Sequence, residues 1–99
     1  MEANPQGVSV LVPRTLMPLV GDQRNLQVPL AETATVAVLL DLLAEQYPVF
    51  VRRVRDETGA LRRYVNVYVD GEDVRRLDGL LTPVGPGHEI TVLQSVAGG

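Results

Sequence analysis

The sequence contains no cysteine and no tryptophan, and aromatic residues make up only 4% of its 99 residues. Without cysteine, the chain has no disulfide, no cysteine-bound metal and no thiol nucleophile. No apolar run approaches the roughly 20 residues that a membrane-spanning helix needs. The opening residues "MEANPQG" lack the features of a signal peptide. These absences predict a small cytoplasmic protein without a membrane segment.

The sequence has no long run of residues with the same charge. Twelve acidic and nine basic residues give a formal net charge of −3, and the arginine pairs alternate with acidic residues along the sequence. No single basic face is evident from this order, and we therefore expect no nucleic-acid binding.

Candidate catalytic or metal-binding groups are also few. His88 is the only histidine, and no second imidazole or carboxylate cluster gives it the spacing of a metal site. Asp70, Glu72 and Asp73 are interpreted as turn residues, because aspartate favours turns and no apolar pocket accompanies them. No set of nucleophile, base and orienting group can be assembled. The sequence predicts a protein that is not an enzyme and binds no metal or cofactor.

Two segments near the N-terminus have the pattern of β-strands. Residues 1–7 show no periodicity and are predicted to form a flexible arm. The segment "VSVLV" at 8–12 is rich in β-branched residues and stops at a proline. The segment "RNLQVPL" at 24–30 alternates apolar and polar residues, and a Gly-Asp turn signal precedes it. These segments predict a hairpin joined by a loop, and Pro29 predicts that its second strand lies at a sheet edge.

One main helix is predicted over "TVAVLLDLLAEQYP" at 35–48. Thr35 is a suitable N-cap, because its hydroxyl can accept a hydrogen bond from a first-turn N–H, and Pro48 marks the end. A short helical turn and an exposed loop are expected after it, before residue 64. Apolar side chains recur at helical spacing along one stripe: Val36, Leu39, Leu40, Leu43 and Tyr47.

The clearest strand pattern lies in "RYVNVYVDGEDVRR" at 63–76. Asp70-Gly71 is a strong hairpin signal, because both turn positions favour positive φ. A short return strand is expected near 74–77, followed by a connection and a last strand, "HEITVLQ", at 88–94. Side chains alternate between two faces of the 64–69 strand: Val65, Val67 and Val69 on one, Tyr64, Asn66 and Tyr68 on the other.

The predicted order of elements is β-β-α-β-β-β. The first and last strands are both largely apolar, which suggests that they pair in the centre of the sheet under the helix. This order predicts an α+β fold of the β-grasp (ubiquitin-like) roll: a mixed sheet of four to five strands packed on one main helix. The predicted domain spans residues 8–93, and residues 94–99 form a flexible C-terminal Gly-Gly tail.

The stretch "RYVNVYVDGEDVR" at 63–75 and the ending "TVLQSVAGG" at 91–99 resemble the small ubiquitin-like sulfur carriers of the MoaD/ThiS/CysO type. They look most like the CysO type, and the resemblance covers about residues 8–99. The combination of the Gly-Gly end, the strand–turn–strand motif and the chain length is specific to this family. It is less specific to one pathway.

The resemblance implies a protein co-substrate that binds no cofactor itself. An E1-like adenylating enzyme would use ATP and Mg²⁺ to convert the Gly99 carboxylate into an acyl-adenylate, and a sulfur donor would then leave a thiocarboxylate. The sulfur would pass to a sulfur-accepting synthase, cysteine-synthase-like or other, with a metalloprotease as a further partner. Cysteine biosynthesis is the preferred pathway. The molybdopterin-synthase small subunit, or a carrier for another sulfur-containing metabolite, is the alternative.

The tail and one sheet face are the candidate functional sites. Gly98 and Gly99 have no Cβ, which lets a narrow channel close around the backbone. Ala97 continues this slim profile, and Val96, the larger side chain of the threaded tail, is expected to contact the partner. The resemblance implies that partners dock on the open sheet face: Tyr64, Asn66 and Tyr68. A sheet face partly covered by aromatic residues is also common without function.

Two other functions remain open at this point. The chain could be a non-covalent β-grasp binding module with an inert tail, or a ubiquitin-like modifier that is conjugated to lysines. The absence of lysine also has two interpretations. It reflects codon bias, or it protects an activated C-terminus from self-acylation, because arginine stays protonated and is not a nucleophile. We expect a monomer when the chain is alone.

Overall fold

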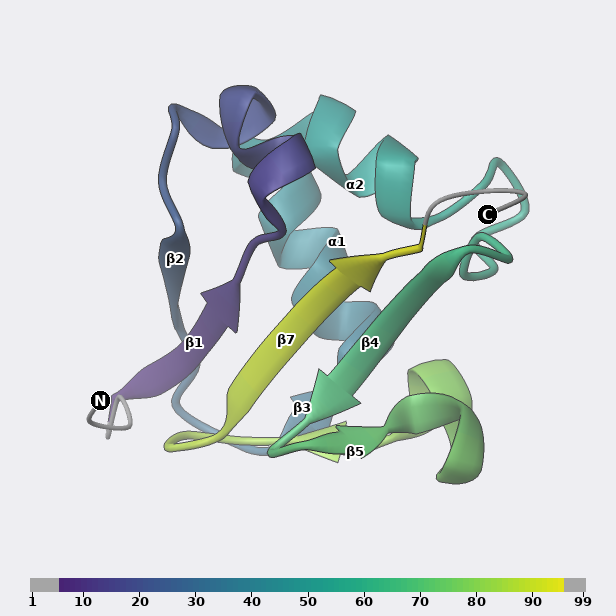
Figure 1. Ribbon diagram of the computed structural model, residues 1–99. Coiled ribbons are helices and arrows are strands. Elements are labelled where there is room, and N and C mark those ends of the chain that lie inside the picture. Colours follow the sequence, from purple (N-terminus) through teal and green to yellow (C-terminus); the bar gives the residue numbers. More distant parts are fainter. Residues whose placement is uncertain (1–5, 96–99) are drawn as a thin grey trace.

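A mixed sheet of five strands forms one layer of the structure, a computed structural model that describes residues 6–95 (Figure 1). The strand order is β2-β1-β7-β4-β5. Strands β1 and β7 run parallel, and the other neighbouring pairs are antiparallel. The first and last strands therefore pair inside the sheet, as predicted, with Val10 opposite Ile90. The five strands are β1 (Gly7–Leu11), β2 (Asn25–Pro29), β4 (Val65–Val69), β5 (Glu72–Asp73) and β7 (Glu89–Gln94).

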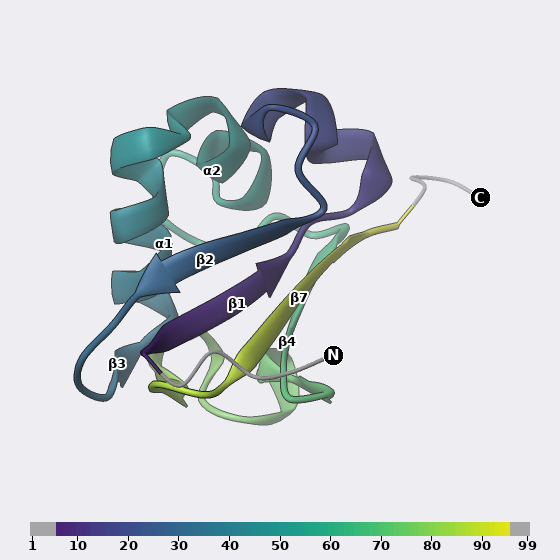
Figure 2. The same cartoon turned by 90° about the vertical axis from the view of Figure 1, so that its left-hand side faces the viewer.

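Two helices, α1 (Val36–Gln46) and α2 (Pro48–Val54), cover one face of the sheet (Figure 2). The predicted N-cap is confirmed, because Thr35 Oγ1 accepts a hydrogen bond of 3.2 Å from the N–H of Val38. Pro48 ends α1 and also opens α2 as a first-turn residue, a position where its missing N–H is no loss. No helix within residues 6–95 is long and apolar enough to cross a membrane.

The core lies between the helices and the sheet. Phe50 of α2 is fully buried, and alternate residues of each central strand point toward the helices. This alternation confirms that the three valines of β4 face the core. The principal buried side chains come from both layers: Val8, Val10, Leu39, Leu40, Phe50, Val65, Val67, Ile90 and Val92.

The segment predicted as a loop after the first strand is instead a 3-10 helix, η1 (Arg14–Val20). Leu16 and Val20 are buried in the core, although Pro18 lies inside the helix. Gly21 ends the helix at a positive φ of 67°, and its N–H bonds to the carbonyl oxygen of Met17. The loop prediction was wrong because proline and the Gly-Asp signal mask a short apolar spacing that suits a 3-10 turn.

The predicted turn at Asp70-Gly71 is confirmed, with φ of 48° and 90° at these two residues. The return strand is shorter and earlier than predicted, since β5 ends at Asp73. Asp73 Oδ1 accepts the N–H of Arg75 at 2.9 Å and starts a 3-10 helix, η2 (Val74–Arg76). A further 3-10 helix, η3 (Gly79–Leu81), and strand β6 (Pro83–Val84) follow; β6 pairs with β3 (Ala34–Thr35) in a second, two-stranded sheet.

Candidate functional site

The predicted working residues of the tail, Val96, Ala97, Gly98 and Gly99, lie outside the described residues. The structure describes the chain as far as Ser95. Gln94, predicted to open the tail, is the last residue of β7. We refer to Gln94 and Ser95 as the tail root.

The tail root is held from two sides. The N–H of Ser95 donates a hydrogen bond of 2.8 Å to the carbonyl oxygen of Tyr64, just before β4. On the other side, Thr15 Oγ1 of η1 donates a hydrogen bond of 2.9 Å to Gln94 Oε1. The chain therefore leaves the sheet at a fixed position.

The predicted docking residues Tyr64, Asn66 and Tyr68 lie on the face of β4 that the helices leave uncovered. Tyr64 is 41% exposed, while the valines that alternate with these residues are buried. In the ladder between β4 and β7, Asn66 lies opposite Leu93, and Tyr68 lies opposite Thr91. The structure thus brings the predicted residues together with β7, directly before the tail root.

Leu93 is a surface residue that the sequence analysis missed. The last strand was predicted to be a central strand under the helix because it is largely apolar, but only Ile90 and Val92 are buried there, and Leu93 is 44% exposed. The strict two-residue alternation of a strand could have revealed it. Together with the three predicted residues, Leu93 forms the open-face patch: Tyr64, Asn66, Tyr68 and Leu93.

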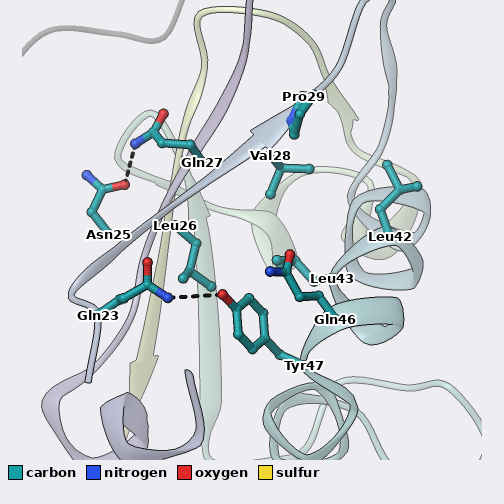
Figure 3. Close-up of a pocket in the computed structure, with 10 residues that line it drawn as sticks. All are labelled: Gln23, Asn25, Leu26, Gln27, Val28, Pro29, Leu42, Leu43, Gln46 and Tyr47. Atoms are coloured by element: carbon teal, nitrogen blue, oxygen red, sulfur yellow. Dashed lines mark hydrogen bonds between the residues drawn. The ribbon is translucent and has the colours of Figure 1, made fainter. Parts of the chain in front are cut away.

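A groove of about 440 Å³ lies between β2 and α1. Figure 3 shows Gln23 donating to the hydroxyl of Tyr47 across this groove, at 3.0 Å. The floor is apolar, with Leu26 and Leu43 among its residues, and the rim carries amide side chains. The groove has no carboxylate, histidine or arginine in its lining. It offers hydrogen bonds but no pair of acid and base.

The titratable groups near the opposite end of β7 have structural roles. His88 Nδ1 accepts the N–H of Gly85 at 3.0 Å, and its Nε2 lies 4.0 Å from Asp70 Oδ2. Asp70 Oδ1 accepts the N–H of Glu89 at 2.8 Å, which ties the β4–β5 turn to the start of β7. Within residues 6–95, no group of three or more histidine and acidic side chains could hold a metal ion. The turn interpretation is confirmed for Asp70, whereas Glu72 and Asp73 form the short strand β5, and Asp73 also caps η2.

Among residues 6–95, Asp56 is the carboxyl whose pKa departs from its ordinary value. The side-chain and backbone hydrogen bonds from Thr58 hold the pKa of Asp56 below its ordinary value, with smaller contributions from the N–H of Ala60 and the charge of Arg62. Asp56 lies in the loop between α2 and β4, where Thr58 and Ala60 both donate to its Oδ1. The carboxylate organises this loop through these hydrogen bonds.

Comparison with known proteins gives matches over nearly the whole chain. Residues 10–99 match the ThiS family. The sulfur carrier protein CysO of Mycobacterium tuberculosis is 36% identical over 94 residues, which are 93% of this chain and 98% of that protein. The crystal structure of M. tuberculosis CysO has a TM-score of 0.79 at 33% identity, covering 90% of this chain and 99% of that one.

A second solved structure is a complex. The crystal structure of the Amycolatopsis orientalis BexX/CysO complex contains a chain that matches with a TM-score of 0.75 at 35% identity, over 93% of this chain and 99% of that one. Fold, sequence and length agree across these comparisons, and the mixed sheet packed on helices is the ubiquitin-like β-grasp roll. This chain belongs to the ThiS family, the ubiquitin-like sulfur-carrier family that its sequence resembles.

Proposed function

We propose that this chain is a sulfur carrier whose Gly99 carboxylate is adenylated by an E1-like enzyme and converted to a thiocarboxylate. The observation that carries the proposal is the tail root: β7 ends at Gln94, and the exposed Ser95 that follows is held by Tyr64, beside the open-face patch. The family match also extends through residue 99, so it includes the Gly-Gly end. A folded body that presents a short tail suits a protein co-substrate rather than an enzyme.

The chemistry needs only the terminal carboxylate from this chain. An α-carboxyl has an ordinary pKa of about 3.3–3.7 and is ionised at neutral pH. Its oxygen attacks the α-phosphorus of ATP, pyrophosphate leaves, and an acyl-adenylate forms on Gly99. A sulfur donor at the sulfide level then attacks the carbonyl carbon. The carbon–oxygen bond to AMP breaks, and a thiocarboxylate remains. Mg²⁺ in the partner would neutralise charge on the phosphates.

The length of the tail fits this division of labour. Four residues follow Ser95, and fully extended they span about 13–14 Å. The body can therefore stay outside the activating enzyme while the terminus reaches a buried site. Gly98 and Gly99 would pass the narrowest part of the channel, Ala97 would precede them, and Val96 would contact its mouth.

Docking would use the open-face patch. Aromatic and aliphatic side chains with one polar neighbour suit the centre of a protein interface, and this patch combines two tyrosines, Leu93 and Asn66. The CysO relative from A. orientalis crystallises in a complex with BexX. For this chain we propose an E1-like enzyme and a sulfur-accepting synthase as successive partners, with a metalloprotease as a third. Cysteine biosynthesis is the preferred pathway, and molybdopterin synthesis or another sulfur-containing metabolite is the alternative.

The test is the intact mass of the chain after incubation with its E1-like enzyme, ATP, Mg²⁺ and a sulfur donor. We expect a species heavier by one oxygen-to-sulfur exchange. A matched variant with one residue appended after Gly99 should fold identically and acquire no sulfur, because its terminal carboxylate no longer follows the Gly-Gly pair. Absence of the heavier species from the wild-type reaction, with active enzyme present, would count against the proposal.

A non-covalent binding module with an inert tail is the second candidate, and the exposed open-face patch favours it. Under this alternative, Tyr68→Ala weakens partner binding while the appended-residue variant behaves like the wild type in every assay. Under the sulfur-carrier proposal, both changes reduce loading. The two variants measured side by side therefore distinguish the candidates.

A further inference from the structure

Charged residues gather at opposite ends of the sheet. Asp70 and Glu72 lie at the β4–β5 turn, and the N–H of Asp70 donates to the carbonyl oxygen of Glu89 at 2.8 Å. Arg62 and Arg63 lie at the other end of β4, before its first residue. A five-residue strand separates these groups by about 17 Å. Two acidic residues therefore lie at one end of β4, and two arginines lie at the other.

Two hollows flank the tail root, and arginines line both. One, of about 230 Å³, lies between η1 and β7 and includes Gln94 in its lining. The other, of about 520 Å³, includes Tyr64, whose carbonyl oxygen holds Ser95. Of the acidic residues, Asp56 alone lines either of these two hollows. We call the five arginines of the two hollows the arginine collar: Arg14 and Arg24 in the first, and Arg62, Arg63 and Arg75 in the second.

No arginine of the collar forms an ion pair within 4.0 Å in the described part of the chain, although the charge of Arg62 contributes to the lowered pKa of Asp56. Ion pairs within 4.0 Å there are limited to Arg55 with Asp41 and His88 with Asp70. Asp56 lines the second hollow, but its Oδ1 accepts hydrogen bonds from Thr58 and the N–H of Ala60. Among residues 6–95, the positive charge beside the tail root is therefore compensated only in part, by the attraction between Arg62 and Asp56.

Neutral acceptors fix two of the guanidinium groups in place. Arg75 donates to the carbonyl oxygens of Val65 and Arg62 and to Asn66 Oδ1, at 2.7–2.9 Å. Arg62 Nε donates to the carbonyl oxygen of Arg52 at 2.8 Å. These bonds hold the cations without cancelling their charge. A preorganised guanidinium loses less side-chain entropy when it meets a carboxylate.

We propose that the arginine collar binds aspartate and glutamate side chains around the mouth of the channel through which the activating enzyme receives the tail. This inference rests on the proposed function. Carboxylates on a protein surface match the fork of donors that arginine presents. An extended tail would place Gly99 up to about 13–14 Å from Ser95. The collar would then stay with the docked body, away from the reacting carboxylate. The collar thus acts on association rather than on chemistry.

Arginine suits this position because its side chain is not a nucleophile. A guanidinium stays protonated and does not attack an acyl-adenylate, whereas a lysine amine at the same place would be a nucleophile. The chain contains no lysine at all. Charge at the rim of an interface changes the association rate and its dependence on salt more than the lifetime of the complex.

The test measures the association rate of the full chain with its E1-like enzyme at several NaCl concentrations. Arg14→Glu and Arg63→Glu each place a negative charge in one hollow. We expect each to slow association about tenfold at low salt, with the difference shrinking as salt rises. Arg53→Glu is the matched control, since Arg53 is exposed on α2, lines neither hollow, and changes the net charge equally. It should stay within about twofold of the wild type.

Collar variants that associate as fast as Arg53→Glu would overturn the inference. A chain without Gly98 and Gly99 separates it from the proposed function: it should acquire no sulfur, yet keep salt-dependent association. If the wild type is loaded with sulfur while the collar variants bind normally, only the collar is wrong. If the wild type neither binds the enzyme nor acquires sulfur, both proposals fail.

Discussion

The central sheet has apolar side chains on both faces, but they are buried on one face and partly exposed on the other. On β7, Ile90 and Val92 are each 1% exposed, whereas Leu93 on the opposite face is 44% exposed. The valines of β4 are buried, whereas Tyr64, just before this strand, is 41% exposed. The covered face supplies the free energy of folding through burial. The open face contributes little to it, and its apolar groups remain available for a partner.

The largest expected effect comes from a matched pair on one strand. Ile90→Ala removes a fully buried side chain and should reduce the free energy of unfolding by about 2–5 kcal/mol. Leu93→Ala removes as many carbon atoms from the open face and should cost about 1 kcal/mol or less, while weakening binding to the activating enzyme. Urea unfolding and an association assay on both variants check this. Equal losses of stability would break the comparison between the faces.

The second largest effect on stability is expected at the Asp70-Gly71 turn, which sets the register of β4 against β5. Gly71 has a φ of 90°, and nothing lies within 4 Å of a Cβ added there, so Gly71→Ala costs backbone strain alone. We expect a loss of about 1–2 kcal/mol in urea unfolding. Gly71→Asn should lose less, because asparagine tolerates positive φ better. Should Gly71→Ala prove as stable as the wild type, this turn does not help to assign residues to the two faces.

The third largest effect on stability is expected from the N-cap of helix α1. Thr35→Ala removes the hydroxyl that accepts the N–H of Val38 and should cost about 1 kcal/mol. Thr35→Ser keeps the acceptor and should stay close to the wild type in thermal unfolding. Partner binding at the open face should be unaffected by either change, since α1 covers the other face. A loss of binding in Thr35→Ala, measured where the protein is folded, would show that the faces are coupled.

The smallest effect on stability is expected from the loop before β4, which belongs to neither face of the sheet. The pKa of Asp56 is lowered chiefly by the side-chain hydrogen bond from Thr58. Its stabilising contribution is therefore fully present above the unfolded pKa of about 3.9 and is lost as pH falls through the lower folded value. Thr58→Ala should raise the pKa of Asp56 toward its ordinary value in an NMR titration. An unchanged titration would show that Thr58 is not the cause.

Local patterns predicted much of the fold. The alternating valines, the Asp70-Gly71 turn and the Thr35 cap depend on neighbouring residues only, and the structure confirms each of them. The pairing of β1 with β7 was also predicted, from the apolar character of both segments. Pro29 lies at the end of the edge strand β2, as its missing N–H suggested.

The features that were missed depend on tertiary position. In the 3-10 helix η1, Leu16 and Val20 are buried in the core, and a short sequence pattern does not show which residues of a connection will be buried. The arginine collar joins residues from η1 and from the start of β4 that lie far apart in the sequence. Leu93 was obscured because an apolar residue looks the same on either face of a strand. The roles of Val96 to Gly99 remain predictions.

The placement of β7 has a consequence for how the chain folds. Strands β2 and β1 lie on one side of β7, and β4 and β5 lie on the other, so the sheet is not continuous until this last strand enters. Pairing residues so distant in sequence makes sheet completion a late and comparatively slow event. The hydrogen bond between Ser95 and Tyr64 forms only with that event. An enzyme that recognises the tail root together with the open face would therefore select carriers that have finished folding.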